Sequence, residues 1–224
     1  TKEYSKLLTG RILSFRIMPL DYREYLSFST TKTLKEYLQY GGFPEVVLEQ
    51  DEEKKRFLLE QYFENIIHKD IIDRYAIRNS QQLFALARYL ISTSGAKVSK
   101  NNLSHVFGIA KDTIALYMEY MLDAFLLLEV SYFSYSAKIK HDVSKLTKYY
   151  ATDLGLVFIA NPKFSENKGQ MFETAVALKL AQTCSEIYYW YEKGGEVDFI
   201  AGKKAIQVTA TDKIPEREIK SILL

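Results

Sequence analysis

Two acidic side chains near the end of the chain alternate along a stretch that has the pattern of a β-hairpin. Glu196 and Asp198 belong to the run 194–200, and a tight turn at Gly202 separates it from a second run, 204–209. Because successive side chains of a strand point to opposite faces, both carboxylates lie on one face. Paired carboxylates of this kind can bind a divalent metal ion. The hairpin is therefore a candidate metal site.

Metal-dependent phosphodiester hydrolysis needs further groups around such a hairpin. A nuclease of the restriction-endonuclease type uses a strand Asp, followed on the next strand by an Asp, Glu or Gln two residues before a Lys. Asp198 and Gln207 fit these positions, and Glu173 supplies a third oxygen ligand for Mg²⁺ from a preceding helical run. Thr209 stands where the lysine is expected. A short neutral side chain cannot stabilise the charge that develops on a phosphate.

The presence of threonine instead of lysine at position 209 favours an inert scaffold over an active enzyme. Lys203 and Lys204 are the nearest possible replacements, but both lie at the far end of the hairpin, so we expect neither to reach the carboxylates. Two interpretations stay open. The chain is either a nuclease-like remnant kept for its shape or a Mg²⁺-dependent DNA nuclease that uses Glu173, Asp198 and Gln207.

Other site chemistry has little support in the sequence. His68, His105 and His141 lie far apart, and Cys184 has no metal-type ligand nearby, so no zinc spacing exists. No Gly-x-x-x-x-Gly-Lys-Ser/Thr loop occurs, so we expect no bound cofactor and no ATP hydrolysis by this chain alone.

Composition indicates a globular chain with no membrane segment. Of its 224 residues, 47% are hydrophobic and 26% charged, which is enough apolar material for a folded core. A single cysteine cannot form an internal disulfide, and no apolar run approaches the roughly 20 residues that span a bilayer. We therefore expect a cytoplasmic protein. The net charge of +2 is too small to indicate nucleic-acid binding by itself.

The elements that must position the hairpin begin with a helical region. Apolar residues recur every three to four positions over much of 33–75, interrupted by a Gly-Gly-Phe-Pro loop at 41–44. Upstream, residues 10–20 have the alternation of a strand that ends at Pro19, and 21–26 have the pattern of a short capped helix.

Residues 80–153 predict three helices followed by two strands, which together make a winged helix-turn-helix. The third helix is expected from Lys111 to Leu128, with Asp112 or Thr113 as its cap. The strands are expected over 130–140 and 148–153.

A winged helix places its third helix where a DNA reader lies and its hairpin beside the DNA backbone. Lysines around the wing can pair with phosphates, which gives affinity without sequence information. Winged helices also serve protein contacts, so DNA and a protein partner both stay open. The lysines expected to contact nucleic acid are Lys111, Lys138, Lys140, Lys145 and Lys148.

Beyond the winged helix, residues 169–180 predict a helix that packs on a sheet, and 186–191 predict a strand before the hairpin. This order is typical of the first half of an α/β nuclease-like domain. The predicted fold class is therefore α+β.

A further set of motifs runs along nearly the whole chain: Leu8–Arg11, Pro19–Leu26, Tyr40–Glu45, Lys69–Ile71, Ile77–Asn79, Tyr120–Phe125, Phe133–Ser136 and Gly195–Phe199. As a set, they resemble the C-terminal region of prokaryotic AAA-family P-loop ATPases. The resemblance implies an upstream core that binds ATP, a helical lid subdomain, a winged helix and a C-terminal domain of unknown function with a restriction-endonuclease-like fold. In the intact protein Arg11 is then a candidate phosphate sensor, because guanidinium matches phosphate geometry.

This resemblance divides the chain into parts and suggests roles for them. The leading expectation is a non-catalytic regulatory module that binds DNA or a protein partner through its winged helix; the alternatives are the nuclease and an oligomerisation module with interface anchors among 17 tyrosines and 13 phenylalanines. The expected parts are 1–32, a tail of the ATPase core with a linker; 33–79, the helical subdomain; 80–160, the winged helix; and 161–224, a nuclease-like domain that looks truncated.

Overall fold

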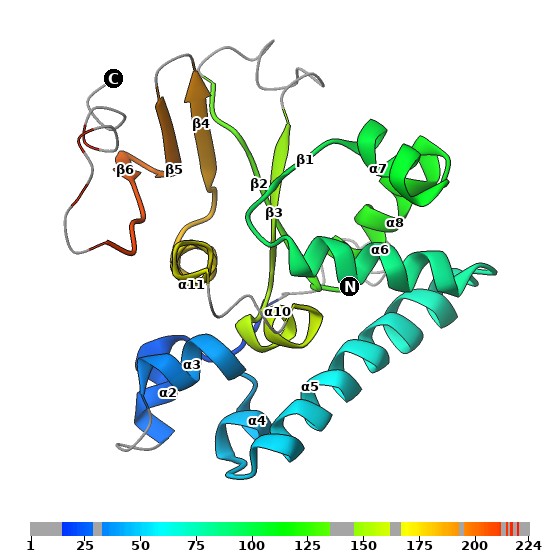
Figure 1. Cartoon of the computed structure of the whole chain (residues 1–224), viewed down its shortest axis with the longest axis horizontal. Coiled ribbons are helices and arrows are strands. Elements are labelled where there is room, and N and C mark those ends of the chain that lie inside the picture. Colours follow the sequence, from blue (N-terminus) through cyan, green and yellow to red (C-terminus); the bar gives the residue numbers. More distant parts are fainter. Residues whose placement is uncertain are drawn as a thin grey trace.

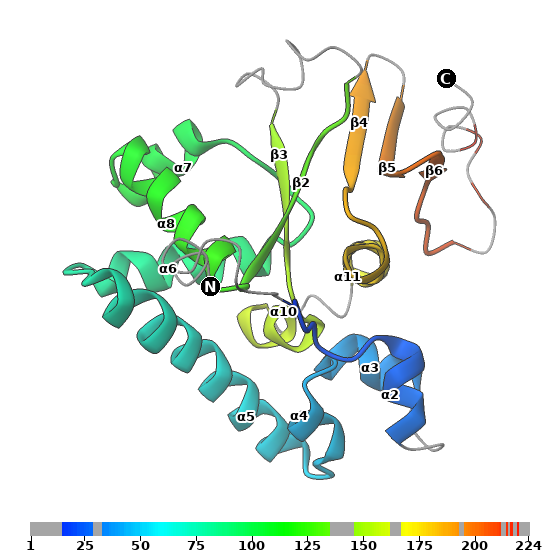
Figure 2. The same cartoon turned by 180° about the vertical axis from the view of Figure 1, so that it is seen from behind.

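The computed structural model describes residues 15–28, 33–134, 146–161, 167–192 and 195–211, together with positions 214, 216 and 219. Within this part of the chain the fold is α+β, as the sequence predicts, with helices around a six-stranded mixed sheet (Figures 1 and 2). The strand order is β1-β3-β2-β4-β5-β6, and among the strands of the described residues only the β2–β4 pair is parallel. The strands are β1 (Lys97–Val98), β2 (Leu127–Tyr132), β3 (Thr147–Ala151), β4 (Tyr188–Glu192), β5 (Gly195–Ala201) and β6 (Lys204–Ile206).

Several helices begin where a side chain caps the backbone. At the start of α2, Asp21 Oδ1 accepts a hydrogen bond from the Glu24 amide at 2.8 Å, and Glu24 Oε2 accepts one from the Asp21 amide at 2.9 Å. This reciprocal pair is a capping box, and Thr33 and Asp51 cap α3 and α5. The N-terminal helices are α2 (Tyr22–Phe28), α3 (Leu34–Tyr40), α4 (Pro44–Leu48), α5 (Glu52–Asn65), the π-helical η1 (Ile66–Asp73) and α6 (Ser80–Ser92).

The strand predicted to end at Pro19 is wrong for residues 15–18, whereas 10–14 lie outside the described residues. The backbone of this segment forms hydrogen bonds with a loop and with a side chain instead of with a neighbouring strand. The Leu20 amide donates to the Gly42 carbonyl at 2.9 Å, and Gln182 Nε2 donates to the Pro19 carbonyl at 3.0 Å.

The predicted glycine loop joins α3 to α4 and packs against a buried carboxylate. Asp153 accepts hydrogen bonds from the Gly42 and Gly155 amides, both at 2.7 Å, and burial raises the pKa of Asp153 to about 6. Gly41 has φ +74°, and a Cβ there would lie 2.0 Å from Asp153 Oδ1. Only glycine both adopts this positive φ without strain and leaves room for the Asp153 carboxylate.

Residues 80–151 have the topology of a winged helix. A helix (α6), a short strand (β1), two helices and two strands follow one another, and β3 pairs antiparallel with both β1 and β2. Residues 135–145, which hold most of the predicted wing, lie outside the described part. The two middle helices are α7 (Lys100–Phe107) and α8 (Lys111–Asp123).

The third helix begins at Lys111, as predicted, but its predicted cap and its predicted end are wrong. The N-cap of α8 is Ala110 without a side-chain hydrogen bond, so neither Asp112 nor Thr113 caps it. The helix stops at Asp123, because Phe125 takes a positive φ of 55° and the chain turns into β2. The apolar run that was expected to lengthen the helix therefore starts a buried strand.

The C-terminal part contains one helix that the sequence analysis did not predict. Asp153 caps α10 through the Gly155 amide. The predicted helix at 169–180 and the predicted hairpin are present, although β6 stops before Gln207. The C-terminal helices are α10 (Leu154–Ala160) and α11 (Lys168–Thr183).

Strands β2 and β3 separate two layers of the molecule. Tyr149 packs in the same apolar cluster as Met118 of α8, whereas Tyr150 packs with Ala177 of α11 and Phe199 of β5. Figures 1 and 2 show α6, α7 and α8 on one side of these strands and α11 on the other. No helix in the described part of the chain is both long and apolar enough to cross a membrane.

Candidate functional site: a carboxylate–lysine cluster

Lys148 of β3 is the centre of a cluster of charged side chains. Its Nζ lies 2.9 Å from Glu173 Oε1 on α11, 2.9 Å from Glu196 Oε1 on β5 and 3.8 Å from Asp198 Oδ1 on the same strand. Only 5% of the Lys148 side chain is exposed. Three carboxylates that are distant in sequence from the lysine therefore converge on one buried ammonium.

Strand alternation positions most of these groups. Glu196 and Asp198 share a face of β5, as predicted, and Lys148 and Tyr150 share a face of β3. The Tyr150 hydroxyl donates to Glu173 Oε1 at 2.6 Å.

A second lysine, Lys97 of β1, extends the cluster toward solvent. Because Lys97 and Lys148 are register partners, their side chains lie side by side. Lys97 Nζ is 2.8 Å from Glu196 Oε2 and 4.2 Å from the centre of the Tyr191 ring. The Glu196 and Lys97 side chains, 38% and 26% exposed, form the solvent-facing edge of the site.

The cluster carries an excess of negative charge. Three carboxylates and two ammonium groups give −3 + 2 = −1. Burial, together with the neighbouring Glu173 carboxylate, raises the pKa of Asp198 to about 6. Burial by itself lowers the pKa of Lys148, but Glu173 and Glu196 outweigh it and the pKa of Lys148 is raised. A partly buried site with uncompensated charge and a shifted carboxyl is typical of functional sites.

Gln207 and Thr209 take different positions around Asp198. Gln207 Oε1 accepts a hydrogen bond from the Asp198 amide at 3.3 Å, and Asp198 Oδ2 accepts one from the Val208 amide at 2.9 Å. Thr209 Oγ1 lies 3.0 Å from Thr211 Oγ1. Gln207 therefore supports the backbone of β5, and Thr209 turns to its own loop.

The site contains a lysine that the sequence analysis assigned to another role. Lys148 was expected among the exposed lysines of a wing, but it is buried because alternation on β3 turns it toward α11. Lys203 and Lys204 stay exposed at the turn, as expected, and Lys111 is exposed at the start of α8. The other expected basic contacts, Arg11, Lys138, Lys140 and Lys145, lie outside the described residues.

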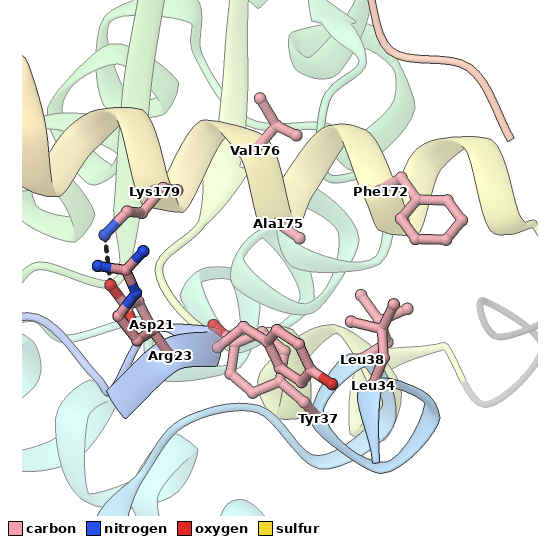
Figure 3. Close-up of a pocket in the computed structure, with 10 residues that line it drawn as sticks. Asp21, Arg23, Leu34, Tyr37, Leu38, Phe172, Ala175, Val176 and Lys179 are labelled. Carbon is pink, nitrogen blue, oxygen red and sulfur yellow. Dashed lines mark hydrogen bonds and ion pairs between the residues drawn. The ribbon is translucent and has the colours of Figure 1, made fainter. Parts of the chain in front are cut away.

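Helix α11 is held on its other face, so that Glu173 points toward the strands. Lys179 pairs with Asp21, which ties the helix to the start of α2 (Figure 3). Gln182 of the same helix bonds the Pro19 carbonyl. Between α11 and the pair α2–α3 lies a hollow of about 360 Å³, whose apolar walls include Leu34, Tyr37, Leu38, Phe172, Ala175 and Val176.

In the part of the chain that the structure describes, no group of three or more His, Cys, Asp or Glu side chains is arranged to hold a metal ion. The carboxylates of the cluster are drawn instead around Lys148 Nζ. The site is therefore an ion cluster, and its carboxylate oxygen atoms are of the type that binds a metal cation.

Fold and site together define an α+β protein in which a winged-helix topology and a carboxylate–lysine cluster share one sheet. The chain belongs to the family described as "Domain of unknown function (DUF8612)", whose model matches residues 31–166. That match includes Lys148 and ends before α11.

Two curated relatives align with nearly the whole chain. An uncharacterized protein of Methanocaldococcus jannaschii is 31% identical over 99% of this chain and 55% of its own length. An uncharacterized protein of Haemophilus influenzae is 28% identical over 96% of this chain and 56% of its own length. The chain thus spans about half the length of the curated relatives it matches. No solved structure matches the chain.

Proposed function

We propose that the chain carries the active site of a Mg²⁺-dependent phosphodiester hydrolase of the nuclease type. The observation that supports this proposal is the position of Lys148, whose ammonium meets Glu173, Glu196 and Asp198. Thr209 left the sequence without a catalytic lysine, which favoured an inert scaffold. A lysine from β3 supplies the missing cation from another direction.

The side-chain types in the cluster suit a magnesium ion, although in the described residues the carboxylates are arranged around the Lys148 ammonium. Mg²⁺ takes oxygen ligands, uses one or two carboxylates and keeps several water molecules. Glu173 and Asp198 are the candidate ligands, and a dication would offset the net charge of −1 in the cluster. When bound, Mg²⁺ would polarise a phosphate oxygen as a Lewis acid.

The chain's own residues have separable roles in this proposal. The ammonium of Lys148 stabilises negative charge on the phosphate, an effect that is strong where water is excluded. The Val208 amide holds one oxygen of Asp198 and leaves Oδ1 facing the lysine. Lys97 orients Glu196 at the open edge, from which a substrate reaches the cluster.

Nicking of supercoiled plasmid DNA in Mg²⁺ or Mn²⁺ tests the proposal. We expect the wild-type chain to nick DNA and Asp198→Asn to lose about 100-fold or more, because the change removes a charge that the site depends on. Glu64→Gln, an exposed substitution on α5, is the matched control and should keep full activity. Equal nicking by Asp198→Asn, or no metal-dependent nicking by the wild type, would refute the proposal.

A second candidate function is the non-catalytic regulatory module, in which the ion cluster around Lys148 only stabilises the fold. A different observation on the same cluster favours this structural alternative. Lys148 Nζ already occupies the space between the carboxylates and leaves only 5% of its side chain exposed. If this ion cluster is purely structural, Mn²⁺ will not raise the melting temperature of the wild-type chain. A rise in the wild type that Asp198→Asn abolishes would exclude the structural alternative.

For the whole protein, we propose that this chain follows the nucleotide-binding core of an AAA-type ATPase. The supporting observations are the family resemblance of the motifs and the relatives, which are about twice as long as the chain. ATP hydrolysis by the full-length protein, absent from the 224-residue chain, is the expected result. A full-length protein that neither binds nor hydrolyses ATP would contradict it.

A further inference from the structure

A second surface, on the opposite side of β3 from the cluster, has a chemistry of its own. A hollow of about 410 Å³ lies beside α8, where Asp112, Leu116 and Glu119 line it from one face of the helix. Their spacing of four and three residues places them in one row. Glu129 of β2 and its register partner Tyr149 of β3 line the other side. We call this hollow the α8 groove.

The α8 groove has an apolar floor. Met118 is fully buried and Tyr149 nearly so, while the Leu116 side chain stays exposed at 43%. Leu122, one helical turn beyond Met118, continues this apolar strip. An exposed leucine above a buried apolar floor offers a partner an anchoring contact.

The rim of the α8 groove is acidic. Among the described lining residues, Asp112, Glu119 and Glu129 face one cation, Lys100, which gives this lining a formal charge of −2. As far as the described residues go, none of the three carboxylates forms an ion pair, and Glu129 accepts only the Ser131 hydroxyl at 2.9 Å. This negative charge is therefore available to an external cation.

The negative charge of the α8 groove favours a protein partner over DNA. The third helix of a DNA-reading winged helix lies in a groove flanked by phosphates, which lysine and arginine must neutralise. Here the row formed by Asp112 and Glu119 would repel those phosphates, and Glu129 adds to the repulsion. Phosphate binding is thus disfavoured at the position where the sequence pattern placed a DNA reader.

We propose that the α8 groove binds a basic amphipathic segment of a partner protein. Lysine or arginine side chains of the segment pair with Glu119, Glu129 and Asp112, and its apolar side chains pack on Leu116 and the groove floor. Complementary charge and a helical apolar row are the features that peptide-binding grooves combine. This proposal does not depend on whether the cluster around Lys148 is catalytic.

Fluorescence anisotropy with defined probes tests the proposal on the 224-residue chain. The probes are a labelled 14-residue helical peptide of leucine and lysine, the same peptide with glutamate in place of lysine, and a 20-base-pair DNA duplex. We expect the lysine peptide alone to bind, and its affinity to fall as salt concentration rises.

Substitutions of groove residues test whether the peptide binds in the α8 groove. Glu119→Gln combined with Glu129→Gln should weaken peptide binding about tenfold, which corresponds to about 1.4 kcal/mol. Leu116→Ser should weaken binding at high salt as well, because its contact is apolar. Glu64→Gln is the control that should change nothing. Unchanged affinity in the groove variants, or duplex binding that Lys111→Gln weakens, would overturn the proposal.

Discussion

Replacement of Lys148 by methionine removes the cation on which the candidate site is centred. The methionine fills a similar volume, but Glu173 and Asp198 lose their shared ammonium, and the formal charge of the cluster goes from −1 to −2. Removing one partner of a buried ion pair typically costs about 3–5 kcal/mol, because the remaining charge stays buried and unpaired. Since whole domains are stable by only about 5–15 kcal/mol, this loss is large.

Urea unfolding followed by circular dichroism at pH 7.5 measures the loss. Lys203→Met, in the exposed turn after β5, is the matched control and should change stability by less than about 0.5 kcal/mol. Adding Asp198→Asn to Lys148→Met returns the cluster to −1, so the double variant should recover part of the loss. We expect a coupling energy of about 1–3 kcal/mol from the double-mutant cycle.

The reasoning fails if Lys148→Met unfolds within about 1 kcal/mol of the wild type, since surface ion pairs alone contribute that little. It also fails if Asp198→Asn destabilises the Lys148→Met chain further. Either result would mean that the carboxylates relax away from one another and that the cluster is not held together by charge.

Two further predictions concern the acids and the glycine loop. Because the pKa of Asp198 is raised from 3.8 to about 6, the folded state holds the proton more tightly than the unfolded state. Its contribution to stability is therefore full below about pH 4 and is lost as pH rises through about 6, by up to about 3 kcal/mol. Because the pKa of Asp153 is also raised to about 6, Asp198→Asn should reduce, without abolishing, the slope of the unfolding free energy measured at pH 4, 5, 6 and 7. Gly41→Ala should destabilise the chain by more than about 2 kcal/mol, because its Cβ would meet Asp153. Gly108→Ala, at a similar φ of +63° but with open space around it, should cost only about 1 kcal/mol, and equal losses would show that the contact is unimportant.

Most of the fold follows from local patterns in the sequence. The four-residue spacing of Leu59, Phe63 and Ile67 predicts a buried helix face, and all three are essentially inaccessible to solvent. Helix α10 was missed because its residues from Leu154 to Phe158 are all buried and leave no polar face to mark a period. Phe125 was placed in a helix because composition does not reveal its positive φ.

The candidate site was predictable only in part, for a related reason. Asp198 and Glu196 belong to one strand, so alternation is enough to place them together. Lys148 is 25 positions from Glu173 and reaches it across the fold, which no local spacing can indicate. The available signal was weak: one charged residue in a short strand, in phase with Tyr150, which also contacts the site.

The charges on the two sides of β3 also narrow the prediction that this winged helix binds DNA. Lys148 is turned into the cluster, and the exposed row of α8 is acidic, so neither can contact the phosphates of a DNA duplex bound along α8 and the wing. The predicted basic wing is left with Lys138, Lys140 and Lys145, which stand in sequence beside a single acid, Asp142. DNA binding through the winged helix stays a prediction that rests on these three lysines and on Lys111, which is exposed at the start of α8. A protein contact through the α8 groove involves none of these lysines. DNA and a protein partner would therefore bind through different residues of the winged helix.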